Sequence, residues 1–460
     1  MREWEEGTAR RAFYEEILQE NPRLYRPARD LALPDGDPAA VVFRWVLGPA
    51  LGAFVRWLLE EAEEAGIRRL YFLARDGYWF FEAAHILGGT FRQPVDCRYL
   101  SCSRQSLRLP LFHKNRQGAL DAVCRGGLRV TPGRILRRAG LTEEERAETL
   151  RLLALPFGAE EPVPYARLAE VRRGLEGCGY FLACLDRHSR EAWPGLAGYL
   201  RQEGLLDEIP AAVVDSGWTG TIQQSLGEAL AHLGRKGRLT GYYWGLYELP
   251  GGVRRADYRS YAFSPEGDWR WKAGFNNNLF EAAYTAPHGS TLGYRREGEA
   301  YLPVYGALPE SRRAFVRRTG EYLMAYTQKL SEEGRVPFSP EADRQTVRRL
   351  LRAFMGAPTP EEAAVFGALP FSDDVLEGEE TPLAAPLTEG DLREGHALPR
   401  LLAAAGLRAG PERESAWYEG SAVLSGRHVR RHLRQNRLVQ LLRHGRKIRR
   451  ARRRRKEENA

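Results

Sequence analysis

The chain has 460 residues, of which 43% are hydrophobic and 10% aromatic, and a formal net charge of +9 at pH 7. This length and aromatic content exclude a disordered chain and predict a large core divided over two or three domains. The five cysteines form no CxxC pair or His–Cys cluster, which argues against a disulfide framework and structural zinc. Without an apolar signal segment or an apolar run of about 18 residues, we expect a cytoplasmic protein with no membrane-spanning helix.

The first hundred residues follow the order helix, buried strand, turn, helix. After an N-terminal extension over residues 1–44, Gly48-Pro49 opens a helix, because proline suits a first helical turn. Leu70–Ala74 is wholly apolar and predicts a buried strand, Arg75-Asp76-Gly77 a turn, and Trp79–Leu87 a second helix. This order is typical of a parallel α/β sheet.

The same order returns further along the chain. Ile209–Val214 predicts a buried strand, Asp215–Thr221 a loop, Ile222–Leu233 a helix and Leu239–Leu246 the next strand. These elements form one complete βαβ unit. Between the two units, residues 104–198 are Arg-rich and predict a helical insertion.

The second half of the chain carries weaker signals. Residues 250–300 are aromatic and Gly-rich and predict loop and strand rather than helix, residues 305–355 predict helix, and residues 356–412 predict a surface segment or a small helical appendage. The expected organisation is an extension (1–44), an α/β core (45–300) with the insertion, a helical appendage (301–426) and a basic tail (427–460).

A turn rich in glycine and hydroxyl groups, Asp215-Ser216-Gly217-Trp218-Thr219-Gly220-Thr221, follows the second strand. The N-terminus of the next helix offers unpaired N–H groups and a positive dipole end. Gly217 and Gly220 let the backbone approach an anion, Thr219 and Thr221 add hydroxyl donors, and Asp215 accepts hydrogen bonds from sugar hydroxyls. This pattern predicts a site for phosphate and ribose; an ordinary helix cap with packing glycines is the alternative.

Other phosphate motifs are excluded by detail. The turn has no lysine of a Walker loop, no second aspartate of a haloacid-dehalogenase-type phosphatase, and no dinucleotide-binding GxGxxG.

The charged turn after the first strand, Arg75-Asp76-Gly77, adds to the hypothesis of a phosphate and ribose site. Arg75 could hold pyrophosphate through its fork of donors, and Asp76 could hold Mg²⁺ through water or take a proton from an acceptor. An Arg–Asp surface pair at an ordinary strand exit is the alternative.

The run Asp215–Thr221 resembles the 5-phosphoribosyl pyrophosphate (PRPP) loop of type I phosphoribosyltransferases, in which two acidic residues precede a Thr-Gly-x-Thr turn. By this resemblance, Asp215 holds the ribose hydroxyls, and Thr219, Gly220 and Thr221 hold the 5-phosphate. Ser216 stands where the family has its second acidic residue, a departure that weakens the ribose contact. The turn Arg75-Asp76-Gly77 stands where the family has its pyrophosphate loop, and the fold implied is a parallel sheet of the type I kind.

A narrower resemblance, over roughly residues 45–425, is to the transferase half of bacterial polysaccharide-biosynthesis proteins. It is carried, in order, by YFLARDGY at 71–78, YLSCSRQSL at 99–107, VVDSGWTGTIQ at 213–223, NLFE at 278–281 and APHGS at 286–290. It implies transfer of 5-phosphoribose from PRPP to a glycan acceptor, which is lipid-linked at the inner face of the cell membrane, followed by dephosphorylation. The phosphatase half that usually precedes such sequences does not occur in these residues, so a separate phosphatase is implied.

The resemblance assigns further roles. Asp76 and Asp215 are the expected Mg²⁺ ligands, and Ser103 and Arg104 a further anion contact, although Ser103 also suits a helix N-cap. Asn278, Glu281 and His288 are expected to bind the acceptor from an Asn-rich loop, with structural roles as the alternative. Trp218, Trp244 and Trp271 could stack on sugar faces, although most tryptophans belong to the core.

The basic tail carries the excess charge. Residues 427–456 hold 15 Lys and Arg and no acidic residue, and the remaining 54 basic and 60 acidic residues leave the rest of the chain at −6. Leu438, Leu441, Leu442 and Ile448 recur at near-helical spacing, and a basic helix with a narrow apolar stripe suits an anionic membrane surface. Nucleic acid, which we expect less, and a solvated end are the alternatives.

Three other functions fit parts of the sequence. A nucleotide-salvage phosphoribosyltransferase leaves the length and the tail unexplained. A phosphosugar hydrolase, as a component associated with a haloacid dehalogenase, needs a pair of catalytic aspartates that we do not find. A non-catalytic phosphosugar-binding or scaffold protein that recruits a partner through its tail is the interpretation that Ser216 favours.

Overall fold

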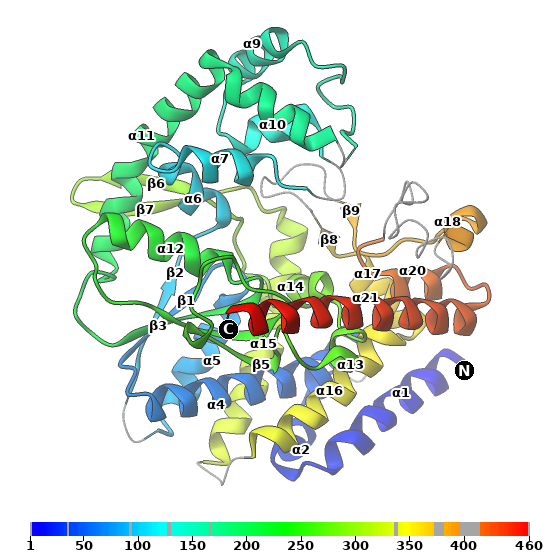
Figure 1. Ribbon diagram of the computed structural model, residues 1–460. Helices are drawn as coiled ribbons and strands as arrows, with labels where there is room; N and C mark the ends of the chain where they lie inside the picture. The colour runs from blue at the N-terminus through cyan, green and yellow to red at the C-terminus, as the bar shows by residue number, and fades with distance from the viewer. Residues whose placement is uncertain are drawn as a thin grey trace.

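The computed structural model describes residues 2–34, 36–91, 94–126, 130–164, 167–334, 339–371, 381–394 and 415–458. These residues form an α/β protein around a five-stranded, wholly parallel sheet in the order β2-β1-β3-β4-β5 (Figure 1). The strands are β1 (Arg69–Leu73), β2 (Asp96–Leu100), β3 (Ala211–Trp218), β4 (Thr240–Leu246) and β5 (Tyr258–Phe263). The parallel sheet predicted from the sequence is confirmed, as are the three strands expected at 70–74, 209–214 and 239–246.

Both faces of the sheet are covered, which explains why its central strands are apolar without alternation. Leu70 and Phe72 of β1 face one hydrophobic core, and Tyr71 and Leu73 face another, because successive side chains of a strand point to opposite faces.

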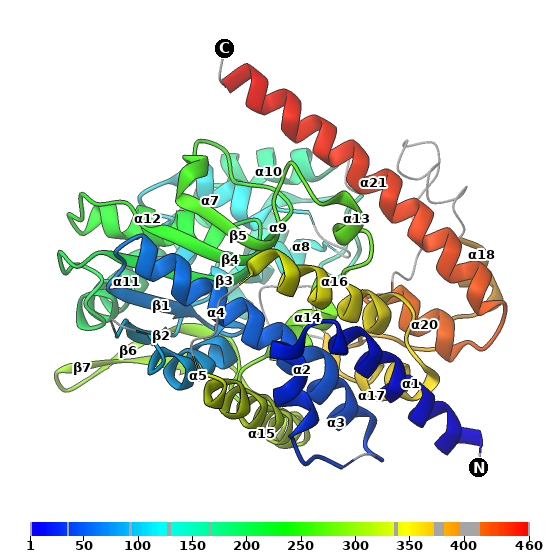
Figure 2. The ribbon, with the colours of Figure 1, turned by 90° about the horizontal axis from the view of Figure 1, so that it is seen from below.

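The larger core lies between the sheet and a layer of long helices (Figure 2). The helices of this layer are α1 (Arg2–Gln19), α2 (Pro22–Arg29), α4 (Gly48–Glu64), α5 (Gly77–Gly88), α15 (Glu310–Glu332) and α16 (Pro340–Gly356). Residues of the predicted N-terminal extension, among them Tyr14, Leu18 and Leu24, are fully buried in this core.

Helix α4 continues a longer helical segment. It follows α3 (Pro38–Val42) and the π-helix η1 (Phe43–Leu47) without a break, so the boundary expected between residues 44 and 45 falls inside one helix. By length and composition the segment Pro38–Glu64 could cross a membrane, which the sequence analysis did not expect. Since 89% of its most apolar window is buried, it is weak evidence for a span and has the burial expected of a core helix.

The opposite face of the sheet is covered by α6 (Arg104–Arg108), α12 (Thr221–His232) and the second half of α11 (Gly179–Gln202). The segment predicted to be a helical insertion also builds a core of its own. Its further helices are η2 (Leu109–Leu111), α7 (Arg116–Val123), α8 (Pro132–Arg138), α9 (Glu143–Leu153) and α10 (Leu168–Gly177). Helix α11 belongs to both cores, because Phe181 and Leu185 pack in the insertion and Leu196 and Leu200 pack on the sheet.

Residues 250–300 contain more helix than the sequence predicted. After η4 (Arg255–Asp257) come α13 (Trp269–Lys272) and α14 (Asn277–Tyr284), so the Asn-rich loop expected around residues 276–288 is wrong for its first part. Asn276 caps α14 by accepting a hydrogen bond from the Leu279 amide at 2.8 Å. The hairpin of β6 (Thr291–Glu297) and β7 (Ala300–Tyr305) then packs on α11.

Short elements fill the rest of the described chain. They are α17 (Pro360–Gly367), β8 (Pro370–Phe371), β9 (Thr381–Pro382), α18 (Glu389–Glu394) and α20 (Tyr418–Leu424). Residues 372–380 and 395–414, which belong to the appendage expected at 301–426, lie outside the described residues. The basic tail forms α21 (Val429–Glu458), a 30-residue helix that packs on α13 and α20 and whose C-terminal end projects past the body (Figure 2).

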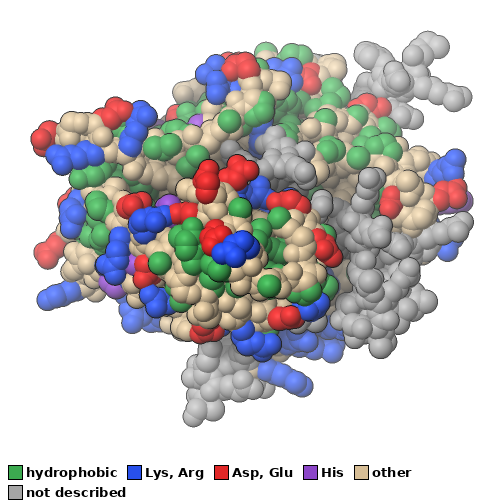
Figure 3. Space-filling view, turned by 90° about the horizontal axis from the view of Figure 1, so that it is seen from above, with side chains coloured by type: hydrophobic (Ala, Val, Ile, Leu, Met, Phe, Trp, Pro, Cys, Tyr) green, Lys and Arg blue, Asp and Glu red, His purple; other side chains and the backbone are tan. Residues whose placement is uncertain are grey.

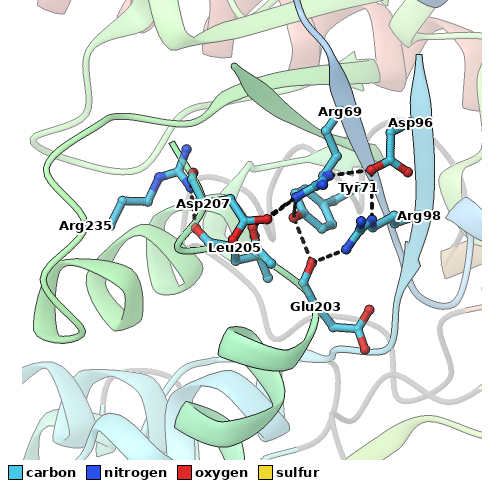
Figure 4. A network of polar contacts seen from close by, with 9 residues as sticks. Arg69, Tyr71, Asp96, Arg98, Glu203, Leu205, Asp207 and Arg235 are labelled. Atoms are coloured by element: carbon cyan, nitrogen blue, oxygen red, sulfur yellow. Dashed lines mark hydrogen bonds and ion pairs between the residues drawn. The ribbon is translucent and has the colours of Figure 1, made fainter. Parts of the chain in front are cut away.

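A polar network ties the amino edge of the sheet to the end of α11 (Figure 4). Arg69, at the start of β1, donates hydrogen bonds to Asp96 Oδ2 at 2.6 Å and to Asp207 Oδ2 at 2.7 Å. Tyr71 and Arg98 both donate to the backbone carbonyl of Glu203, at 2.9 Å each. In this network, each charged group has a partner of opposite charge or a hydrogen-bond acceptor, and together they join β1 and β2 to the end of α11.

Candidate functional site

The candidate site lies at the carboxyl edge of the sheet, where β1 and β3 are neighbours. From β1 the chain moves outward to β2, and from β3 it moves in the opposite direction to β4 and β5. In open α/β sheets, ligands bind in the crevice that such a change of direction leaves beyond the strand ends. The pairing of Phe72 with Val214 brings the turn that starts at Ala74 beside the last residues of β3, from Asp215 on.

A cavity of about 360 Å³ occupies this position. It brings together eleven of the thirteen residues predicted from the sequence: Arg75, Asp76, Ser103, Arg104, Asp215, Ser216, Gly217, Thr219, Thr221, Asn278 and Glu281. Among the described residues, neither Gly220 nor His288 lines it.

One side of the cavity is acidic, with the buried carboxyl group of Asp215 and the half-buried carboxyl groups of Asp76 and Glu281, from three separate segments. Asp76 accepts a hydrogen bond from Ser216 Oγ at 2.6 Å, and Glu281, on α14, accepts one from the indole of Trp218. Burial, and then the neighbouring Asp76 and Glu281, raise the pKa of Asp215 well above its ordinary value. Burial also raises the pKa of Asp76, and burial followed by Asp76 raises the pKa of Glu281 to about 7. Mutually repelling carboxyls of this kind are common at functional sites.

These carboxyl groups suit a magnesium ion that binds together with substrate. In the described part of the chain, no three His, Cys, Asp or Glu side chains lie close enough to hold a metal ion by themselves. Mg²⁺, however, usually takes only one or two protein carboxylates and completes its shell with water and substrate phosphate oxygens. Asp76 and Asp215, the predicted ligands, fit this smaller donor set, and a cation there would offset the burial that raises both pKa values and the repulsion that further raises that of Asp215.

The other side of the cavity is basic and was largely missed by the sequence analysis. Besides the predicted Arg75 and Arg104, the lining includes Arg108, Arg125 and Arg138. Burial, then Arg104, then Arg125 lower the pKa of Arg108 to about 10, so these guanidinium groups are close enough to repel one another. The spacing of Arg104 and Arg108 puts both on one face of α6. That signal was available from the sequence, whereas Arg125 reaches the cavity only through the fold.

The turn after β3 differs from its prediction as a loop. The strand continues through Trp218 because Gly217 pairs with Gly245 and Trp218 with Leu246 of β4. Gly217 has φ +110°, and a Cβ there would lie 2.5 Å from the Gly245 carbonyl oxygen. Gly220 has φ +62°, and its Cβ would lie 2.6 Å from the ring of Tyr258. Packing against β4 and β5 therefore requires glycine at both positions. This explanation does not need the hypothesis that the glycines let the backbone approach an anion.

The N-terminus of α12 opens into the cavity, since Thr219, Thr221 and Ile222 line it. The capping residue is Gly220, and no side chain caps the helix, so the alternative of an Asp or Thr cap is wrong. The hydroxyls of Thr219 and Thr221 lie 3.5 Å apart. Amides at a helix start together with two hydroxyls form a site suited to a phosphate group.

Three predicted contacts have structural explanations. Ser103 caps α6 in a capping box, and its hydroxyl donates to the Thr291 carbonyl at 2.6 Å. His288 lies against the ring of Tyr305, with Nε2 2.7 Å from the Tyr99 hydroxyl. Trp244 and Trp271 are buried in the core at 0% and 4% exposure, which leaves Trp218 as the member of the predicted trio that reaches the cavity.

No protein-family model matches the chain, and no curated protein resembles it significantly. The interpretation of the site therefore depends on its own geometry.

A second cavity, of about 310 Å³, adjoins the first. The two share Thr219, Asn277 and Asn278 as lining residues. The second cavity is walled by α21 through Asn436, Gln440, Arg443, His444 and Lys447. Asn278 is held by a hydrogen bond to the Ala416 carbonyl at 3.3 Å and lies where the two cavities meet. Helix α21 of the basic tail therefore lines the cavity next to the candidate site.

Proposed function

We propose that the protein is a phosphoribosyltransferase of the type I kind that transfers 5-phosphoribose from PRPP to a glycan acceptor. The observation that carries the proposal is one cavity at the switch point of a parallel sheet, with three carboxyl groups on one side and arginines on the other. PRPP has the complementary layout, because its ribose hydroxyls lie between a phosphate and a pyrophosphate. Carboxylates accept hydrogen bonds from hydroxyls, and arginine forks bind phosphoryl oxygens.

In the proposed complex, the 5-phosphate binds at the N-terminus of α12, with Thr219 and Thr221 as hydroxyl donors. Asp215 accepts hydrogen bonds from the ribose hydroxyls. Arg75 and Arg104 bind the pyrophosphate, with Arg108 behind them. Mg²⁺, held by Asp76 and Asp215, supplies positive charge to the pyrophosphate oxygens when bound.

The proposed step is a displacement at C1 of the ribose. The bond from C1 to the pyrophosphate oxygen breaks and its electron pair leaves with the pyrophosphate, while the acceptor hydroxyl oxygen forms the new bond and inverts C1. Arg75 and Arg104 stabilise the negative charge that develops on the leaving group. Arg75 is half-buried and Arg104 exposed, so water screens the interaction of Arg75 less than that of Arg104.

The proton of the acceptor hydroxyl needs a base, and Glu281 fits that role better than Asp76, the residue favoured by the sequence. A general base is most effective when its pKa lies near the working pH, and that of Glu281 is about 7. Asp76 already accepts a hydrogen bond from Ser216 and is the proposed magnesium ligand. Ser216, which replaces the family's second acidic residue, therefore positions Asp76 in this proposal.

The acceptor would enter from the second cavity, across Thr219 and Asn278. Amide and carboxyl side chains beside aromatic rings suit sugar hydroxyls and sugar faces, and this cavity offers Asn277, Gln440 and Glu248 beside Tyr247 and Tyr418. The product retains the 5-phosphate of the donor, so its conversion to an unphosphorylated ribofuranoside requires a separate phosphatase.

The test is product analysis after incubation with PRPP, Mg²⁺ and extracted bacterial glycolipids. Pyrophosphate release together with a mass gain of one phosphoribosyl group on a glycan would support the proposal. Calorimetry with PRPP and Mg²⁺ separates the alternatives, with Asp215→Asn as the variant that should lose binding. Tight PRPP binding without any pyrophosphate release would identify a binding protein, the alternative that Ser216 favours, and no binding would end the proposal.

A further inference from the structure

The exposed face of α21 carries an inference that goes beyond the proposed transfer reaction. Counted in helical steps of three, four or seven residues, one stripe of the helix comprises Arg431, Arg434, Leu438, Leu442, Arg449 and Arg453. All six are exposed, and Leu438 and Leu442 are two of the protein's exposed large hydrophobic residues, at 51% and 42%. The stripe thus has two leucines at its centre and arginines at both ends.

The opposite face of the helix is fixed to the body. Asn436 is buried and donates to Glu419 Oε1 at 2.6 Å, and the ring of His444 stacks on Tyr247 with centroids 5.4 Å apart. Ile448 is buried as well. Arg452, at the border of the exposed stripe, also reaches the body by donating to the Glu266 carbonyl at 3.0 Å. The tail is therefore no loose peptide, and the predicted apolar stripe divides, with Ile448 facing inward and Leu438 and Leu442 facing outward.

We propose that this outer stripe is a docking surface for an anionic membrane. A helix that shows arginines around a few leucines lies in the plane of a membrane interface, with the leucines inserted and the guanidinium groups at the lipid phosphates. The sign of the charge is specific to this surface: residues 427–456 hold 15 basic and no acidic residues, whereas the rest of the chain carries −6. On the face over the insertion, by contrast, basic and acidic side chains are interspersed (Figure 3).

The fixed inner face adds a geometric consequence. Because Asn436, Gln440 and His444 of the same helix wall the second cavity, docking would place that cavity about one helix diameter, roughly 10 Å, from the lipid headgroups. A substrate held in the membrane by a lipid could then present its polar part to the cavity. The docking itself does not depend on the proposed transfer reaction.

The test is sedimentation of the full chain with vesicles of phosphatidylcholine alone or mixed with phosphatidylglycerol. We expect binding only to the mixed vesicles, and weaker binding as salt rises, because salt screens the attraction. R431Q/R434Q/R449Q/R453Q should weaken binding by about a hundredfold or more, since each exposed cation contributes to attraction at an anionic surface. L438S/L442S should weaken it by about tenfold through lost insertion.

The matched control removes four exposed arginines elsewhere, as R173Q/R190Q/R201Q/R317Q. It changes the net charge equally and should keep full vesicle binding. If it loses as much affinity as the α21 variant, or if the full chain ignores the mixed vesicles at low salt, the proposal is overturned. Displacement from vesicles by duplex DNA, with no preference for phosphatidylglycerol, would assign the stripe to nucleic acid. A dimer that L438S/L442S dissociates while vesicle binding persists would assign the leucines to a second copy of the chain.

Discussion

The two edges of the parallel sheet place charged side chains in opposite circumstances. At the amino edge, Arg69 is matched by the carboxylates of Asp96 and Asp207 (Figure 4). At the carboxyl edge, Asp76 and Glu281 raise the pKa of the buried Asp215 beyond the effect of burial, and Arg104 offsets this only in part. The same sheet thus has one edge whose charges are matched by opposite charges and one where carboxyl groups repel one another, as expected if the proposed substrate and cation bind there. Such a difference distinguishes a binding site from a structural ion-pair network more clearly than a perturbed pKa alone.

The largest expected effect is the loss of stability when the network around Arg69 is broken. Arg69→Met keeps the apolar stem but removes the donors to Asp96, Asp207 and the Gly204 carbonyl. We expect a loss of about 2–4 kcal/mol in the free energy of unfolding, because buried polar groups lose their partners while the two carboxylates remain partly hydrated. Denaturant unfolding measures this loss. Arg98→Met, a more exposed neighbour in the same network, should cost less than about 1 kcal/mol. PRPP affinity should stay unchanged in both variants, and a drop would show that the edges are coupled.

The next effect addresses the opposite edge. Arg75→Ala should slow pyrophosphate release by about a hundredfold, the usual loss when a donor to developing charge is removed. Its melting temperature should stay close to that of the wild type. Arg98→Ala is the control for the loss of one arginine at the far edge, and its turnover should be normal. A destabilised Arg75→Ala with intact turnover would instead support the surface-pair interpretation of the Arg75–Asp76 turn.

A smaller effect concerns the phosphate contact. Thr219→Ala should weaken PRPP binding by about 1.5–3 kcal/mol, the range of a hydrogen bond to a charged group. Calorimetry with Mg²⁺ present measures it. Thr219→Ser retains the hydroxyl and should bind nearly as well as the wild type. If serine and alanine are equally poor, the threonine methyl group matters rather than a phosphate contact.

The smallest effect is a change of stability with pH. The pKa of Glu281 is about 7 in the folded protein and 4.5 ordinarily, so folding binds a proton between these values and this residue's contribution to stability falls as pH rises through that range. Glu281→Gln removes the loss and should raise the melting temperature by about 1–3 °C at pH 8, with no gain at pH 4. In the wild type, pyrophosphate release should increase as pH rises through about 7, because the base must be ionised, and the variant should lack this step. A stabilised and fully active variant would exclude Glu281 as the base.

Local signals explain which parts of this arrangement could be predicted. β1, β3 and β4 are short apolar runs bounded by turns, and the strand-exit residues Arg75, Asp76 and Asp215 follow from them directly. The extension of β3 to Trp218 could not be predicted, because it depends on pairing with Gly245 and Leu246 on a strand more than twenty residues away. Gly217 even argues against strand by its own propensity.

The composition of two segments misled the prediction. Asn276-Asn277-Asn278 suggested a loop, although asparagine is also a preferred helix cap and Asn276 caps α14. That helix places Glu281 inside the cavity and leaves His288 beyond its end. In the tail, spacing alone grouped Leu438 with Ile448, but only the contact with α13 and Tyr247 decides which side of the helix faces the body. Arg125 could not be predicted as a cavity residue either, because nothing near it in the sequence points to the cavity.

Helix α11 connects the two hydrophobic cores on either side of the candidate site. Its first half is built into the core of the insertion and its second half into the core on the sheet, so a single rod joins the segment that carries Arg125 to the floor that carries Asp215. Pro194 lies within this rod and cannot donate to the carbonyl of Arg190, which makes it the position where the helix bends most easily. The position of Arg125 relative to Asp215 therefore depends on the course of α11, and a substitution at Pro194 could change that side of the cavity without touching its lining.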